Sequence, residues 1–300
     1  MHLRRTGRHP NLAWVHVMRR AVVLVVAAGV VLAPRGNASK RQAASSVASA
    51  AGLSSSSVAF DAKANERGAI VAVTNADDTM AHWSTCAQPD CHPGGKGIPV
   101  STNQTIGNSN PSVDGASMLL TETADSKNFY TNVLWVYKAK ACDACTQMST
   151  DFWAYPVSAS HVGSLEYDAF VFDAADQLDI MWGVQWNQRR GKWQVWNQGT
   201  NRWVDTTVTT GPTFGDWNHL QFADHRVLGD TSCAGTECLY YDSMTLNGTT
   251  YTLNMAEPAG AIHPGWHSVS GFQFQLDAAP VSSGTATISE YIDEANMWAK

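Results

Sequence analysis

The chain has 300 residues, of which 15% are charged, and its formal net charge at pH 7 is −6. Its Lys and Arg residues number only 20 and crowd near the start, so it lacks the basic surface stripe that a nucleic-acid partner requires. Frequent Thr, Ser, Asn, Gly and Trp are typical of strand-rich exported proteins. This length is compatible with a single all-β domain.

Residues 1–38 are predicted to be a signal peptide, because basic residues precede an apolar run at 21–33 that small residues follow. A bilayer span takes roughly 20 apolar residues, so the run favours a secreted, periplasmic or cell-surface protein over a membrane span. Met18 begins a more ordinary signal peptide within the same segment. Residues 39–67 are rich in Ala and Ser and form a predicted linker.

From residue 68 onward, short β-type runs alternate with Gly, Asn, Asp and Pro, and no long helical period interrupts them. Hairpin turns are expected at 188–191, 198–201 and 247–248. We therefore predict one domain over 68–300, built from two packed antiparallel sheets. The expected strands are 70–74, 116–121, 132–137, 150–155, 164–172, 178–186, 193–197, 202–207, 217–222, 239–246, 250–254, 271–277 and 287–297.

The cysteines number six and fall into three close pairs. An even count in an exported chain predicts three short-loop disulfides. A zinc site would need two pairs brought together, and the CxxC at 142–145 is also compatible with a redox motif, but neither a ligand repeat nor a βαβ context accompanies them. The expected bonds are Cys86–Cys91, Cys142–Cys145 and Cys233–Cys238.

The segment 165–204 carries the strongest functional signal, because carboxylates and tryptophans lie close together in it. Strand alternation places Glu166 and Asp168 on one face. Tryptophan rings stack on the C–H face of a pyranose, and carboxylates and amides bind its hydroxyls, so the segment indicates a sugar-binding surface. The alternatives are that the two acids are solvated residues on an open sheet and that the tryptophans fill the core. These tryptophans are Trp182, Trp186, Trp193, Trp196 and Trp203.

The same alternation gives two further strands a polar face, with Gln185 and Asn187 on one and Gln273 and Gln275 on the other. If these strands share a sheet with Glu166 and Asp168, the polar side chains line one groove. Trp196, opposite Trp193 and Val195, is then the expected stacking platform at its edge.

Six segments of the chain are informative about its family: LEYDAFVF, MWGVQWNQRRGKWQVWNQGTNRWVDT, FGDWNHLQFADHR, YYDSMTLNGTTYTLN, GFQFQLD and YIDEANMW. Together they resemble the concanavalin A-like lectin/glucanase superfamily. The resemblance implies an all-β, two-sheet antiparallel jelly-roll sandwich with a concave carbohydrate-binding face. It also makes a structural Ca²⁺ plausible, with Asp293 as a candidate ligand, and no other cofactor is expected.

The laminarinase-type glycoside hydrolases of this superfamily carry E-x-D-x-E or E-x-D-x-x-E on one strand. Glu166 and Asp168 match the first two positions, but Phe170 and Val171 stand where the proton donor belongs. The Q-[IV]-H strand of the alginate lyases is approached only by the segment at 273–275, which lacks the His.

We therefore expect a secreted lectin-like protein that recognises a polysaccharide, with Glu166 and Asp168 as the catalytic candidates if it is an enzyme. A glycosidase or polysaccharide lyase is the first alternative, with a displaced acid at Asp173, His219 or His225. The second alternative is a structural or adhesive surface protein without sugar binding. That alternative expects Trp182, Trp186 and Trp193 to be buried and the groove to be closed.

Overall fold

The structure, a computed structural model, describes residues 68–87 and 97–300, so the predicted signal peptide and linker lie outside the described residues. Within these ranges the chain forms strands β1 to β16 and one short 3₁₀ turn, η1 (Ala76–Asp78). No helix in this part of the chain is long and apolar enough to cross a membrane.

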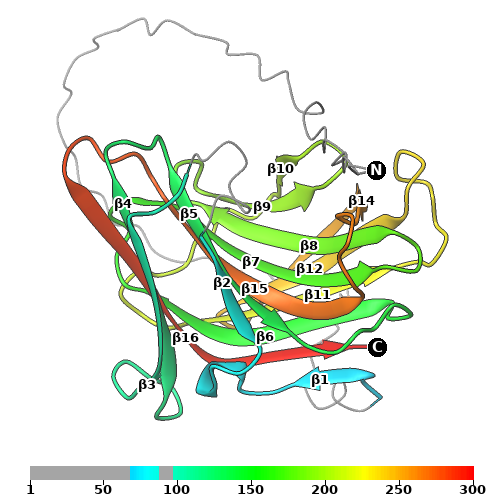
Figure 1. The fold of residues 1–300 in the computed structure, drawn as a ribbon, viewed down its shortest axis with the longest axis horizontal. Helices are drawn as coiled ribbons and strands as arrows, with labels where there is room; N and C mark the ends of the chain where they lie inside the picture. The colour runs from blue at the N-terminus through cyan, green and yellow to red at the C-terminus, as the bar shows by residue number, and fades with distance from the viewer. Residues whose placement is uncertain (1–67, 88–96) are drawn as a thin grey trace, which may run out of the picture. The chain divides into compact units, whose positions relative to one another are not determined.

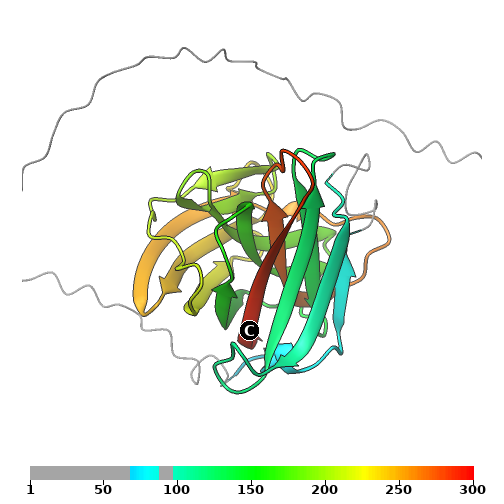
Figure 2. The ribbon, with the colours of Figure 1, turned by 90° about the vertical axis from the view of Figure 1, so that its left-hand side faces the viewer.

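The strands pair antiparallel into two sheets that pack face to face (Figures 1 and 2). The first, called here the β6 sheet, has the order β13-β12-β11-β6-β16-β4-β3, with β1 also paired to β16. Its strands are β1 (Val71–Val73), β3 (Ser101–Asn108), β4 (Ser117–Asp125), β6 (Gln147–Pro156), β11 (Asn218–Arg226), β12 (Cys238–Leu246), β13 (Thr249–Pro258) and β16 (Thr285–Ala299).

The second, the β7 sheet, has the order β10-β9-β8-β7-β15-β5-β2, with β14 also paired to β8. Two antiparallel sheets with almost no helix confirm the predicted sandwich. Its strands are β2 (Trp83–Cys86), β5 (Thr131–Lys138), β7 (Val162–Asp173), β8 (Leu178–Asn187), β9 (Lys192–Asn197), β10 (Arg202–Asp205), β14 (Gly260–Ala261) and β15 (Val269–Ala278).

Each strand expected from the sequence overlaps an observed one, and β2, β3 and β14 are additional. The three expected hairpin turns also form, joining β8 to β9, β9 to β10 and β12 to β13. Asn247 and Gly248 have φ values of 50° and 78°. Positive φ at both residues gives a two-residue turn the twist that its flanking strands require.

Aromatic side chains from both sheets meet in the core between them. Phe152 of the β6 sheet lies 5.1 Å, between ring centroids, from Tyr167 and also from Phe274 of the β7 sheet. Trp182, Trp186 and Trp193 are buried in the same core. The odd-numbered residues of β7 from Leu165 to Val171 therefore face inward, as alternation predicts.

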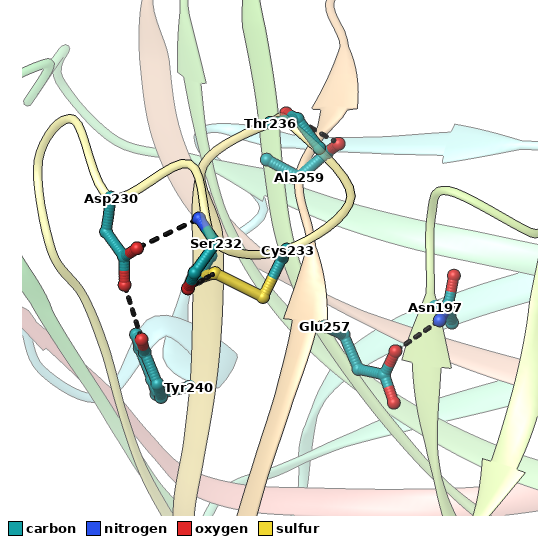
Figure 3. Close-up of a disulfide and its surroundings, with 9 residues drawn as sticks. Asn197, Asp230, Ser232, Cys233, Thr236, Tyr240, Glu257 and Ala259 are labelled. Carbon is teal, nitrogen blue, oxygen red and sulfur yellow. Dashed lines mark hydrogen bonds between the residues drawn. A yellow bond between two sulfur atoms is a disulfide. The ribbon is translucent and has the colours of Figure 1, made fainter.

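Two of the expected disulfides are confirmed. Cys142–Cys145 closes a loop between β5 and β6, and Cys233–Cys238 closes a loop between β11 and β12. In the second loop the Tyr240 hydroxyl donates to Asp230 at 2.5 Å (Figure 3). The third expected bond involves Cys91, which lies outside the described residues. Disulfides form in oxidising compartments, so the two observed bonds are compatible with an exported protein.

Candidate functional site

The strand order brings the predicted polar side chains to one face of the β7 sheet, the face turned away from the core. Glu166 pairs in register with Gln185 on one side and with Gln275 on the other. Asp168 pairs with Gly183 and Gln273 in the same way. We call this surface the polar face. It consists of Glu166, Asp168, Gln185, Asn187, Gln194, Gln273 and Gln275.

Hydrogen bonds run across the polar face from strand to strand. Gln275 donates its amide to Glu166 at 2.6 Å, and Gln273 donates to Asp168 at 2.5 Å. On the other side, the side-chain amides of Gln185 and Asn187 both donate to the side-chain oxygen (Oε1) of Gln194, at 2.7 and 3.1 Å. The amides thus hold the two carboxyl groups and each other in fixed orientations.

One alternative considered from the sequence is wrong: Glu166 and Asp168 are buried and are not solvated residues on an open sheet. Glu166 is 8% exposed and Asp168 is 3% exposed. The neighbouring polar side chains shield each other as well, since Gln185, Gln273 and Gln275 are all buried.

The carboxyl groups of Glu166 and Asp168 lie close enough to influence each other's pKa. Burial, followed by the charges of Asp168 and Asp277, raises the pKa of Glu166 well above its usual value. Burial likewise raises the pKa of Asp168, to about 7, although hydrogen bonds from Glu166 and Gln273 oppose the shift. Two adjacent buried carboxyls cannot both ionise readily, so below neutral pH the pair holds at least one proton.

Gly183 provides the space in which the Asp168 carboxyl lies. A Cβ atom at Gly183 would be 2.9 Å from Asp168 Oδ1 and 2.9 Å from the Cβ of Trp196. Because the second of these neighbours is close to the backbone, Gly183→Ala is expected to destabilise the fold by about 1–3 kcal/mol through overpacking. Urea unfolding measures the change, and a free energy of unfolding equal to that of the wild type would contradict this account.

Trp196 occupies the edge of the polar face that the sequence predicted for it. It is half-buried and packs against Trp203 of β10, with ring centroids 5.1 Å apart. The other tryptophans of the segment, Trp182, Trp186 and Trp193, face the core and do not contribute to the polar face.

None of the three displaced acids considered from the sequence lies beside Glu166. His219 is on β11 of the opposite sheet, where its ring stacks on Trp153 and bonds to Asp151 at 2.6 Å. His225, on the same strand, pairs with Asp242. Asp173, at the end of β7, accepts hydrogen bonds from the backbone of the following turn.

The residues around Asp293 include further carboxylates. Asp293 is fully buried and accepts hydrogen bonds from Ser112, Val113 and Glu294. Burial, with smaller contributions from Asp293 and Asp78, raises the pKa of the nearby Asp77 to about 7. A cation would relieve this repulsion, yet no three metal-ligating side chains among the described residues are placed to hold one. A structural Ca²⁺ stays a prediction.

Some members of the site were not predicted. Gln194 lies between Gln185 and Asp205 and donates to Asp205 at 2.7 Å. Asp277 accepts hydrogen bonds from Ser164 and Gln275. Alternation along β9 and β15 would have found Gln194 and Asp277, since they share a face with Trp196 and Gln275.

No family model matches the chain, and no curated protein matches its sequence. Solved structures are similar in fold at low identity. The cellulose induced protein Cip1 is 10% identical, covering 76% of this chain and 96% of its own, with a TM-score of 0.43. An alginate lyase mutant in complex with alginate trisaccharide is 12% identical, covering 66% of this chain and 88% of its own, with a TM-score of 0.42.

The lectin UEA-II complexed with galactose is 8% identical, covering 77% of this chain and 99% of its own, with a TM-score of 0.41. Likeness at this level carries no argument about function, so a function has to be argued from the residues of the polar face.

Proposed function

We propose that the protein binds a carbohydrate at the polar face of the β7 sheet. The observation that carries the proposal is the side-chain amide oxygen (Oε1) of Gln185. This atom is buried and has no hydrogen-bond partner within the described part of the chain. A buried acceptor without a donor costs about 1–3 kcal/mol. A ligand hydroxyl would supply that donor once the neighbouring side chains move apart, since the oxygen is closed to solvent in this structure.

The chemistry around Gln185 suits a sugar. Glu166 and Asp168 supply carboxyl groups with at least one proton below neutral pH, so together they both donate and accept. Trp196 and Trp203 add apolar ring surface at the edge of the same face. Hydroxyl-binding groups beside aromatic rings match the alternating polar and apolar surfaces of a pyranose.

The arrangement favours binding over hydrolysis. Retaining hydrolysis needs two carboxyl groups about 5 Å apart, and inverting hydrolysis needs a wider gap for a water molecule. Glu166 and Asp168 are instead buried and held by Gln275 and Gln273, and none of the displaced acids considered from the sequence lies beside Glu166. A lectin-like activity without bond cleavage is therefore the leading proposal, ahead of a glycosidase or polysaccharide lyase.

A structural or adhesive protein without sugar binding is the second candidate. It expects Trp182, Trp186 and Trp193 to be buried, and they are. The same burial follows from their place on the core side of β8 and β9, so it does not separate the two proposals. The side chains of the polar face are closed against each other in this structure, as the second candidate also expects, so glycan binding in solution has to decide between the two proposals.

A glycan array with a parallel reducing-sugar assay tests the proposed function. The array is expected to return at least one glycan, with no release of reducing ends. For that glycan, Glu166→Gln, Gln185→Ala and Trp196→Ala are each expected to lower affinity by about 1–3 kcal/mol in calorimetry. Circular dichroism confirms that each variant is folded.

Three outcomes would overturn this proposal. Absence of any glycan ligand would favour the structural protein. Release of reducing ends or of unsaturated sugars would favour the enzyme. Unchanged affinity in all three folded variants would place the site on another surface and make the acidic pair structural.

A further inference from the structure

The face that carries Glu166 and Asp168 becomes aromatic farther along β7. Phe170 and Phe172 continue the same alternation, and their rings stack with centroids 4.6 Å apart. They form a second hydrophobic cluster with Ile262, separate from the core between the sheets. Gly271, paired with Phe170, leaves space for its ring, since a Cβ atom there would lie 2.6 Å from it.

The connection from β14 to β15 (Figure 1), residues 262–268, lies against this aromatic end and is fastened at both of its ends. The backbone N–H of Ile262 donates to Gln177 at 3.1 Å. At the other end, the Ser268 hydroxyl donates to Asp143 at 2.8 Å and accepts from the backbone of Ala174. These bonds fix the connection relative to β7.

Trp266 projects from this fastened connection and is 46% exposed. Its ring lies 4.7 Å from that of Phe172, tilted by 36°, while its backbone N–H donates to His263. Among the tryptophans of residues 68–87 and 97–300, no other is exposed to this degree. A large aromatic ring that is backed on one side and open to solvent on the other is ready to stack on a ligand.

We propose that Trp266 is a stacking subsite for a pyranose ring of the same glycan, at the aromatic end of the polar face. The inference rests on the proposed function. Asp168 and Phe172 are four residues apart on one strand, which corresponds to roughly 13 Å. This span exceeds a single sugar ring, so the ligand class is an oligosaccharide or polysaccharide chain, and a monosaccharide reaches only one end of the site.

Oligosaccharides of increasing length, cut from the glycan that the array returns, test the subsite. Trp266→Ala is expected to weaken binding of the longer oligosaccharides about tenfold, as loss of a well-placed aromatic anchor does, and to leave the shortest unaffected. Trp266→Phe keeps an aromatic ring and should lose less affinity than Trp266→Ala. Phe129→Ala is the matched control, because Phe129 is 77% exposed and lies in the connection between β4 and β5.

Tryptophan fluorescence gives a second readout. Long oligosaccharides are expected to shift the emission of the wild type to shorter wavelength, since they cover the exposed indole of Trp266. The shift should be smaller in Trp266→Phe, where Trp196 is the tryptophan that still contacts the glycan. Unchanged affinity of Trp266→Ala at every length, where Glu166→Gln weakens binding, overturns the subsite and leaves the proposed function standing. An equal loss of affinity of Trp266→Ala for oligosaccharides of every length also overturns the subsite. No glycan binding by the wild type overturns both.

Discussion

Arg226→Met is expected to lower the free energy of unfolding by about 3–5 kcal/mol, because it leaves a buried carboxylate without its partner. The Arg226 side chain is completely buried, and its guanidinium donates to Glu237 at 2.9 Å. It also donates to the backbone carbonyls of Asp143 and Cys145. One residue thus connects both disulfide loops to β11.

Urea unfolding measures this loss of stability. Two further variants show whether it comes from the unpaired buried charge. The double variant Arg226→Met with Glu237→Gln should recover part of the stability, since it neutralises one of the two buried carboxylates that lose their partner. The other carboxylate is Asp173, which lies 3.8 Å from the Arg226 guanidinium. Arg190→Met is the matched control: Arg190 pairs with Asp205 at 2.7 Å, but its side chain is 57% exposed. Its loss should stay within about 1 kcal/mol. A similar small loss for Arg226→Met would mean that the loops are held by other contacts.

Much of the fold could be predicted because the central strands alternate strictly. In β15, Phe272, Phe274 and Leu276 face the core while Gln273 and Gln275 face outward, so the sequence alone sorts the two faces. Once β7, β8 and β15 are neighbours, their polar residues must meet. The composition of the polar face is thus a consequence of alternation and strand order.

The missed strands lack that alternation. Ser101–Asn108 is almost entirely polar, lies at the edge of its sheet and has few apolar residues to show a period. Trp83–Cys86 is short, and Gly260–Ala261 has only two residues. Such strands form because a neighbouring strand offers hydrogen bonds, a tertiary effect that local sequence does not carry.

The burial of the site residues was harder to predict than which residues form the site. Alternation puts Glu166 and Asp168 on the outward face, which suggests exposure to solvent. Amide side chains on the two neighbouring strands, β8 and β15, nevertheless close around them. Trp266 was missed because it stands in a connection, where periodicity says nothing about orientation. Its position depends on Phe172, which is distant in sequence and near in space.

Stability is expected to fall as pH rises from about 4.5 to about 8, and Glu290 is the clearest cause. Glu290 is fully buried on β16, where its Oε1 accepts a hydrogen bond from the Tyr167 hydroxyl at 2.7 Å. Burial raises its pKa from 4.5 to about 8, although the Tyr167 bond opposes the shift. The folded protein therefore holds a proton that the unfolded chain releases, and its stabilising contribution disappears across this window.

Glu290→Gln tests this assignment, because the amide keeps an acceptor for Tyr167 and does not ionise. The stability of the variant relative to the wild type should rise by roughly 3–5 kcal/mol across the window, since one unit of pKa shift corresponds to about 1.4 kcal/mol. Glu122, whose pKa burial also raises to about 8, stays in both proteins, so part of the pH dependence should remain in the variant.

Urea unfolding at pH 5, 6, 7 and 8 measures the difference between the two proteins. Ser289→Ala is the matched control, because Ser289 lies on the same strand, is half-buried and does not ionise. Its profile should run parallel to that of the wild type. If the difference between Glu290→Gln and the wild type does not change with pH, Glu290 does not ionise within this window, and the pH dependence must come from other buried carboxyls such as Asp77 and Glu122.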